Sequence, residues 1–583
     1  MKYSVLVKVP VLLAAGLLLA QLQLGVSKAQ QSAPPANQQV ILKELQDFTR
    51  EGWNCRLGPD FAFFHPGAPE KFPEIWMPPV KAVKDWNYEI GGPWTDKAGD
   101  FSSTQGQILY CPDEIGTDGV DRVTILEWTN NTFSERPQPP WNTGSHPDPA
   151  SIDWDKVVHG HAGTPLAMAR GMAGWSNCGV ALFPSGLVAT AGTVTGYGSN
   201  PTFQFPKNKL PTAISVTNKS EFAFVTVVDT DLMKGQVAVL ALQSGGPKRD
   251  FPHEWPDAYP GLPNVAVFTG IKLLGYIDLP GITFPTGISA VGNATTPRLN
   301  GRDGNAGMLR EYNLAQAADR NVFWQGTNSQ YSSTLGYAVV ISKYDAKVAF
   351  LDLRPLFQRV REMYFTTEDN FQKTRELGPD PTQWPYTFDI DPTWEPKIVK
   401  VLSQVEPTAA LASLDGARTP RAFVASLDGK VQIYDVGALA ADGPSLAPIR
   451  NTGFVQVGRN PVCLAYQKGS FDTFIAVSRG DREIAWVKAN EEGAQVIERL
   501  RDSRLQDPVY VETADTHGIE TPLLTVADFN GRQILNYRYG ELVFATQGGA
   551  RFGMGADGKA IFECGGTMTF PGCPFCISAA NVN

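Results

Sequence analysis

Short apolar runs separated by turn residues recur through the second half of the chain. One group opens at 407–411 (Pro-Thr-Ala-Ala-Leu), continues at 421–425, turns at Asp428-Gly429 and ends with an alternating run at 430–436. Alternation with a period of two, broken by an Asp-Gly turn, predicts antiparallel strands joined as a hairpin. The stretch THGIETPLLTVADFNGRQILNYRY at 516–539 follows the same plan around an Asn-Gly turn.

These groups repeat with a regular spacing. Their openings lie at residues 211, 285, 407, 461 and 516, and all but the last begin with proline. The last two intervals give a period of about 54 residues, and the earlier ones contain insertions at 293–335 and 354–394. Three or four short strands at this period are typical of propeller blades. We therefore predict an all-β propeller, with seven blades; six or eight blades, or an array of β-sandwiches, are the alternatives.

The blade openings resemble those of the bacterial YVTN and lactonase-type β-propellers, whose blades begin with a Pro-x-Gly-Ile-Ala-Val-like phrase. Pro285-Thr286-Gly287-Ile288-Ser289 carries the resemblance, and the other openings vary it over residues 200 to 545. Weaker strand patterns at 107–111 and 122–128, and again at 165–193, predict two further blades. The resemblance implies the fold but no particular activity, because propellers serve as lyases, lactonases, oxidases and binding modules alike.

The first 29 residues have the features of a secretory signal peptide: Lys2 and Lys8, an apolar stretch at 9–20, and the ending Ser27-Lys28-Ala29. An uncleaved membrane anchor is the alternative. Cleavage predicts a secreted or periplasmic protein without a membrane span. Residues 30–104 begin with a polar leader and continue with a Pro- and Trp-rich segment. The prolines of this segment cannot take part in a sheet ladder, so we expect it to form an irregular strap or cap on the propeller. The propeller then spans 105–558, and a Cys-containing tail spans 559–583.

Removing residues 1–29 takes away three lysines and no acidic residue, so the formal charge of −9 becomes 47 − 59 = −12. An acidic exported protein is a poor candidate for binding nucleic acid or anionic lipid. The partners expected are a protein or a small-molecule ligand on one face of the propeller. Short helices are expected at 306–318 and 355–364, within the insertions at 293–335 and 354–394. These insertions either form the recognition surface of the propeller or have no role in binding.

Three of the seven cysteines lie in the last 20 residues, and export permits disulfides. A staple within the tail, or from the tail to the N-terminal region, would join the two ends of the ring; the candidate cysteines are Cys55, Cys111, Cys564, Cys573 and Cys576. The Cys573-x-x-Cys576 spacing also matches redox pairs, although those normally stand at a helix N-terminus, and a zinc site is a third alternative. Cys463, on a buried strand, is expected to be the unpaired thiol.

Equivalent positions of successive openings should surround a central channel. These channel-lining candidates are Thr212, Thr286, Thr408 and His517. His159 and His161 lie two residues apart, on one side of an extended chain, and could share a divalent metal with His517. With six histidines in the chain, a large multi-copper centre is disfavoured. Ordinary strand and loop histidines are the alternative.

Three functions are compatible with this sequence. The one we favour is an exported propeller that acts as a ligand- or protein-binding module, because no complete catalytic constellation is present. The second is a metal-dependent propeller enzyme, a lactonase-like hydrolase or an oxidoreductase, with its site at the channel mouth. The third is a structural envelope protein. Whether the chain is an enzyme at all is left open by these residues.

Overall fold

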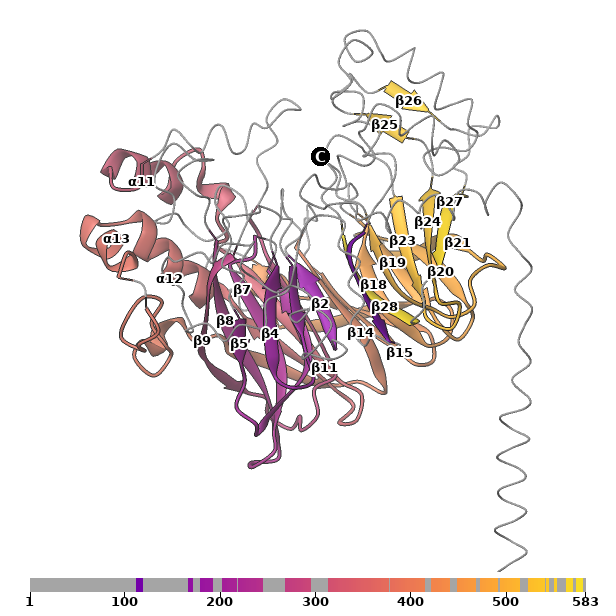
Figure 1. Cartoon of the computed structure of the whole chain (residues 1–583), viewed down its shortest axis with the longest axis horizontal. Coiled ribbons are helices and arrows are strands. Elements are labelled where there is room, and N and C mark those ends of the chain that lie inside the picture. The colour runs from indigo at the N-terminus through magenta and orange to yellow at the C-terminus, as the bar shows by residue number, and fades with distance from the viewer. Residues whose placement is uncertain are drawn as a thin grey trace, which may run out of the picture.

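The computed structural model describes most of the repeat region (Figure 1). The described residues are 112–118, 166–170, 179–191, 202–217, 219–244, 268–294, 313–376, 378–414, 421–440, 448–467, 472–490, 493–513, 523–539, 542–544, 550–552, 562–569 and 573–579. The predicted signal peptide (1–29), the leader and strap (30–104) and the predicted strands at 107–111 and 122–128 lie outside these residues.

Six four-stranded antiparallel sheets follow one another along the chain. The first contains β2 (Ala167–Arg170), β3 (Gly179–Leu182), β4 (Leu187–Ala191) and β5 (Thr202–Gln204). The second contains β6 (Lys209–Val216), β7 (Phe222–Asp229), β8 (Lys234–Ser244) and β9 (Phe268–Asp278). The third contains β10 (Gly287–Gly292), β11 (Gly336–Ser342), β12 (Lys347–Asp352) and β13 (Lys397–Ser403). Sequential neighbours pair in every one of them, as a meander requires.

The remaining sheets repeat this order. The fourth contains β14 (Pro407–Ser413), β15 (Arg421–Ser426), β16 (Lys430–Asp435) and β17 (Arg450–Gln456). The fifth contains β18 (Pro461–Tyr466), β19 (Thr473–Ser478), β20 (Glu483–Asn490) and β21 (Gly493–Leu500). The sixth contains β22 (Pro508–Thr513), β23 (Leu523–Asp528), β24 (Gln533–Tyr539) and β27 (Phe562–Thr569), and a small hairpin, β25 (Leu542–Phe544) and β26 (Ala550–Phe552), lies between β24 and β27.

Burial explains why the second strand of each group is the most apolar in sequence. Every residue of β7, β11 and β19 is buried, because both faces of these strands are covered by neighbouring sheets. The outer strand β21 instead alternates between exposed and half-buried residues, and its last residue alone is buried. Each pair of consecutive sheets shares a hydrophobic cluster, from the first and second to the fifth and sixth.

The innermost strands are joined around the ring by side-chain hydrogen bonds. The Ser215 hydroxyl of β6 accepts from the Ala290 amide of β10 at 2.9 Å, and the Ser289 hydroxyl of β10 accepts from the Ala412 amide of β14 at 3.0 Å. These serines occupy the same place in their openings, four residues after the proline. The contacts therefore arrange the sheets face to face around one centre, which confirms the predicted propeller.

The C-terminal strand completes this series. β28 (Cys573–Ala579) pairs with β1 (Pro112–Asp118) and contacts the innermost strands of both the first and the sixth sheets. Its ladder has a bulge just after Pro574, and β6, β14, β18 and β22 each have one just after their own opening proline. Residues 562–569 and 573–579, which the predicted tail of 559–583 included, thus belong to strands of the ring. The number of seven blades stays a prediction.

The sixth sheet also corrects one predicted opening. Its innermost strand is β22, which begins at Pro508, whereas the sequence pattern placed the opening at Thr516. The apolar residues at 523–527, predicted as the second strand, do form β23. The phrase at 516–519 itself lies outside the described residues.

The insertions form a helical layer against the third sheet. Its elements are α11 (Ala317–Trp324), a 3₁₀ turn at Ser329–Tyr331, α12 (Arg354–Phe365), α13 (Glu368–Thr374) and a 3₁₀ turn at Pro392–Trp394. The helix expected at 355–364 is confirmed, because Pro355 can occupy the first turn and one stripe of the helix is apolar. A helix at 306–318 was expected; residues 306–312 lie outside the described residues, and α11 begins at Ala317. A short helix, α14 (Gly437–Ala440), follows β16.

Buried cations hold this layer in place. The Arg361 guanidinium donates to the carbonyl oxygens of Phe323 and Trp324, at the end of α11. The Lys272 ammonium of β9 donates to three carbonyl oxygens of the 378–383 loop. Among the described helices, none is long and apolar enough to cross a membrane.

Candidate functional site on the turn face

One edge of the ring, which we call the turn face, is built from short connections. It consists of the turns between the second and third strands (229–234, 342–347, 426–430, 478–483 and 528–533) and the linkers to the next sheet (279–286, 404–406, 457–460 and 501–507). The two insertions emerge from the opposite edge of the ring. The insertion at 293–335 connects the first strand of the third sheet to the second, and the insertion at 354–394 connects the third strand to the fourth. In Figure 1, α11 and α13 lie beyond that opposite edge.

Aspartates of the turns hold the linkers. The Asp345 carboxylate accepts from the Thr283 and Phe284 amides, both at 2.9 Å. Asp528 likewise accepts from the amides of Gln506 and Asp507. Asp is common in turns for this local reason, and the structure gives these residues a structural role. Burial raises the pKa of Asp528, although these amides and the Gln533 side chain oppose the shift.

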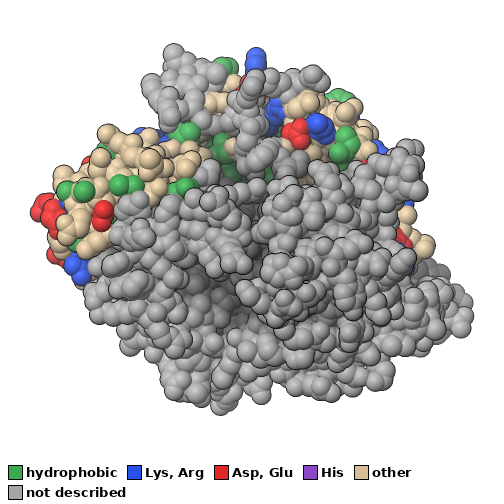
Figure 2. All heavy atoms as spheres, turned by 90° about the horizontal axis from the view of Figure 1, so that it is seen from above, with side chains coloured by type: hydrophobic (Ala, Val, Ile, Leu, Met, Phe, Trp, Pro, Cys, Tyr) green, Lys and Arg blue, Asp and Glu red, His purple; other side chains and the backbone are tan. Residues whose placement is uncertain are grey.

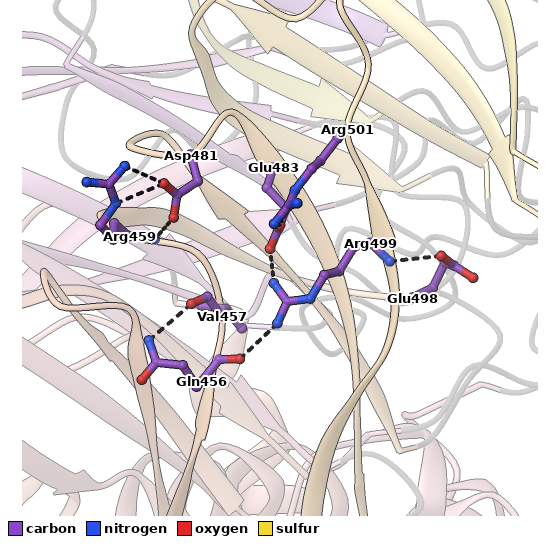
Figure 3. Close-up of polar contacts among 8 residues, drawn as sticks. All are labelled: Gln456, Val457, Arg459, Asp481, Glu483, Glu498, Arg499 and Arg501. Carbon is purple, nitrogen blue, oxygen red and sulfur yellow. Dashed lines mark hydrogen bonds and ion pairs between the residues drawn. The ribbon is translucent and has the colours of Figure 1, made fainter.

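Arginines gather on the turn face where the fourth, fifth and sixth sheets meet it. We call this set the arginine arc; its members are Arg459, Arg479, Arg482, Arg499, Arg501, Arg504 and Arg532. Figure 3 shows part of it, with Arg459 directed at Asp481 and with Arg499 and Arg501 converging on Glu483. The neighbouring pairs are Arg479 with Asp507 and Arg504 with Asp502.

In these pairs the carboxylate lies inside and the guanidinium lies outside. The Glu483 side chain is 0% exposed, whereas the side chains of Arg499 and Arg501 are 36% and 68% exposed. Asp507 is 8% exposed beneath Arg479 at 41%, and Asp481 is 27% exposed beneath Arg459 at 75%. The hydrogen bond from Arg459 lowers the pKa of Asp481, so this carboxylate stays ionised. The surface therefore presents positive charge on a protein whose formal charge is −9.

Two arginines of the arc have no such partner. Arg482 and Arg532 are exposed, and neither forms an ion pair with another described residue. Both stand at the left-handed position of their turns, with φ of 50° and 51°. This backbone conformation favours glycine, so a long cationic side chain there carries a conformational cost without a compensating local contact. Their positions and charge fit a surface that receives an external anion.

Exposed apolar side chains occupy the turn face at the second and third sheets. This apolar patch consists of Leu232, Met233, Phe284, Tyr344 and Val405. The rings of Phe284 and Tyr344 are in edge contact at 6.3 Å between centroids, and Tyr344 is 78% exposed. The Gln404 amide donates to the Ala346 carbonyl, which brings Val405 close to the same turn. Contiguous exposed apolar groups of this kind mark interaction surfaces.

The opposite edge has a different character. Figure 2 views the molecule from above, on the side of the insertions, and its described side chains intersperse acidic, basic and hydrophobic groups. Charged residues of α13 there pair with one another along the helix, as Lys373 does with Asp369 at 3.2 Å. Such pairs leave little net charge for a partner. The turn face is therefore the better candidate for a charge-selective contact.

The predicted metal site lies outside the described residues, because His159, His161 and His517 all fall there. Within the described ranges, no group of three or more His, Cys, Asp or Glu side chains could hold a metal ion. The position in the sixth sheet that corresponds to Thr212 and Thr408 is Val509, since that sheet opens at Pro508. His517 lies outside the described residues, so its place at the channel and the metal site itself stay predictions.

The channel-lining threonines are half-buried and satisfied by local hydrogen bonds. Thr212 bonds the Thr226 hydroxyl at 2.8 Å, and Thr286 donates to the Ile341 carbonyl at 3.3 Å, each within its own sheet. Thr408 instead donates to the Pro461 carbonyl of the next innermost strand. The three occupy equivalent places at the openings, and their exposure to a channel stays a prediction.

The described cysteine side chains form no disulfide. Cys463 is buried on β18, as expected for an unpaired cysteine, and burial raises the pKa of its thiol to about 12. Neither Cys573 nor Cys576 forms a disulfide among the described residues, so the predicted staple through either of them is absent there. They lie on a strand and not at a helix N-terminus, which removes the usual cause of a reactive C-x-x-C thiolate. Cys55, Cys111 and the side chain of Cys564 lie outside the described residues.

Comparison with protein-family models and with curated proteins finds no match. Among solved structures, a periplasmic gluconolactonase from Pseudomonas aeruginosa is 12% identical with a TM-score of 0.38, covering 81% of this chain and 99% of that one. A Lactobacillus plantarum protein is 10% identical, with a TM-score of 0.36 and coverage of 72% and 89%. A functionally unknown protein from Desulfotomaculum acetoxidans is 11% identical, with a TM-score of 0.33 and coverage of 69% and 89%. Similarity at this level carries no inference about function; the sheets and their packing establish the fold.

The arginine arc was absent from the sequence-based candidates. Its members come from the ends of three sheets, and their spacing follows the blade repeat rather than a short motif. The signal present in the sequence is the recurrence of Arg at 479, 482, 501, 504 and 532, always in a turn or linker. To recognise this recurrence from sequence, one must know that the sixth sheet begins at Pro508, because only then do Arg501 and Arg504 fall in a linker between two sheets.

Proposed function

We propose that this chain is an exported propeller that binds an acidic protein partner on its turn face. The observation that carries the proposal is the position of the charges: the buried carboxylates of Glu483 and Asp507 lie beneath more exposed guanidiniums of the arginine arc. The apolar patch on the same face supplies a surface for apolar side chains of that partner. The partner expected is therefore a protein segment that combines Asp or Glu with Leu or Phe.

The buried carboxylates prepare the arginines for binding. Asp507 receives Arg479 through two nitrogens, at 2.6 and 2.7 Å, and Asp502 receives Arg504 in the same manner. A guanidinium held in this way has lost much of its rotamer freedom before a partner arrives, so binding loses less entropy. Its outer N–H groups remain able to donate to a second carboxylate, because the guanidinium carries five donors.

The test is a binding titration of the mature protein with a labelled synthetic peptide that alternates Glu with Leu and Phe. The comparison peptide replaces each Glu by Lys. We expect the acidic peptide to bind in a salt-sensitive manner, because exposed charges are screened by salt, and the Lys peptide not to bind. Fluorescence anisotropy at low and high salt gives both dissociation constants.

The decisive variant combines Arg459→Gln, Arg482→Gln and Arg501→Gln. Three exposed charge contacts at about 0.5 kcal/mol each predict about tenfold weaker binding of the acidic peptide. The matched control, Lys373→Gln on α13 with Arg375→Gln just after it, removes charge from the opposite edge and should leave binding unchanged. Equal loss in both variants, or binding of anionic vesicles in place of the peptide, would overturn the proposal.

A further inference from the structure

A buried amine without a hydrogen-bond partner lies at the other end of the second sheet. Lys219 is in the turn between β6 and β7 and is 1% exposed. Its Nζ atom has no hydrogen-bond partner, and the adjacent Ser220 hydroxyl is also buried without one in the described structure. An ammonium in this state has lost its hydration without forming a hydrogen bond in exchange, which costs several kcal/mol. Such a group needs a functional reason.

The turn around Lys219 is tightly built. The Thr217 hydroxyl accepts from the Glu221 and Phe222 amides and donates to the Glu221 carboxylate at 2.6 Å. Ser220 has a φ of 56°, in the left-handed region. A non-glycine residue in that region is strained, and such strain is concentrated at ligand-binding and active sites.

Glu221, whose carboxylate accepts from the Lys219 backbone amide at 3.2 Å, is fixed from two directions. Besides the Thr217 contact, its carboxylate accepts from the Ser333 hydroxyl at 2.9 Å, at the end of the insertion that precedes β11. The neighbouring Gly292 makes room for Ser333, because a Cβ there would lie 2.5 Å from the Ser333 hydroxyl oxygen. Burial raises the pKa of Glu221, and burial lowers the pKa of Lys219 to about 8 while the Glu221 charge opposes that change.

We infer that Lys219 is a nucleophilic amine that captures an aldehyde or ketone ligand as an imine, with Glu221 as the proton donor. The uncharged Nζ adds to the carbonyl carbon, a C–N bond forms, and a proton passes from nitrogen to oxygen to give the carbinolamine. Glu221, as the acid, protonates the hydroxyl, which leaves as water. The nitrogen then returns its remaining proton to the Glu221 carboxylate, which leaves a neutral imine. No oxidant or reductant takes part.

Lys272 offers a matched comparison within the same sheet. It is also 1% exposed, and burial also lowers its pKa to about 8. Its Nζ, however, donates to the carbonyl oxygens of Gly378, Asp380 and Gln383 at 2.7 to 3.0 Å. The two lysines thus have the same exposed fraction and a similarly lowered pKa, and they differ in whether the Nζ atom donates hydrogen bonds. A reaction at Lys219 that spares Lys272 therefore reports a free amine and not burial alone.

The test treats the folded mature protein with glyoxylate and cyanoborohydride, which reduces any imine to a stable carboxymethyl-lysine. Peptide mass spectrometry then measures the modification rate of each lysine. We expect Lys219 to react at least about tenfold faster than Lys272, because desolvated amines without partners are the activated ones. Its rate should level off above a pH of about 8.

Two variants separate the roles of the residues. Glu221→Gln keeps the acceptor for Ser333 and should slow the capture at Lys219, while Lys219→Arg should abolish it and leave the other lysines unchanged. Modification of Lys219 only after denaturation, or at the same rate as Lys272, would overturn the inference. The site lies on the edge opposite the turn face, so either result leaves peptide binding by the arginine arc to be judged separately.

Discussion

Replacing Lys272 by methionine should loosen the helical layer from the propeller. The change removes three hydrogen bonds from a buried ammonium, at 2.7, 3.0 and 3.0 Å, and leaves three carbonyl oxygens without their donor. Hydrogen bonds to charged groups contribute about 1.5–3 kcal/mol each, and the release of the buried charge offsets part of that sum. We expect the free energy of unfolding to fall by about 2–4 kcal/mol.

The assay for Lys272→Met is urea denaturation followed by circular dichroism, together with limited proteolysis of the 378–391 segment. Lys234→Met in the same sheet is the control, because Lys234 pairs at the surface with Asp278, whose side chain is 59% exposed. Exposed pairs contribute less than about 1 kcal/mol. If the two variants lose the same stability and are cleaved equally slowly, the anchoring role assigned to Lys272 is refuted.

Two further predictions concern backbone strain and pH. Ala346 has a φ of 51° in the turn between β11 and β12, so Ala346→Gly should raise the free energy of unfolding by about 1 kcal/mol in the same urea assay; a loss of stability would contradict this. The pKa of Lys219 is about 8 in the folded chain against 10.5 as the ordinary value, so the unfolded chain binds the extra proton between these values and stability rises with pH across that window. Stability measured at pH 7.5 and 10 should therefore rise by roughly 2–3 kcal/mol more in the wild type than in Lys219→Met, and parallel curves would exclude the shift.

The blade openings show which innermost strands could be identified from the local sequence pattern alone and which could not. Pro211, Pro285, Pro407 and Pro461 were identified from sequence, and each lies within two residues of the first residue of an innermost strand. The phrase at 516–519 was misassigned because an apolar pair after a Thr-His step looks like an opening, while the true strand at Pro508 follows closely on the fifth sheet. The strand at Pro574 was missed because its cysteines suggested a staple, although its residues follow the same phrase as the other openings.

Local alternation and turn residues determined the strands, their order and the propeller class, because each depends on contacts within about fifty residues of chain. The placing of buried charge was decided only by the tertiary structure. Glu483 begins β20 and meets Arg499 and Arg501 at the end of the adjacent strand β21. An insertion that returns more than a hundred residues later places Ser333 beside Glu221, two residues from the buried Lys219. Burial and partnership of this kind depend on which sheets lie face to face, and no periodicity along the chain encodes that.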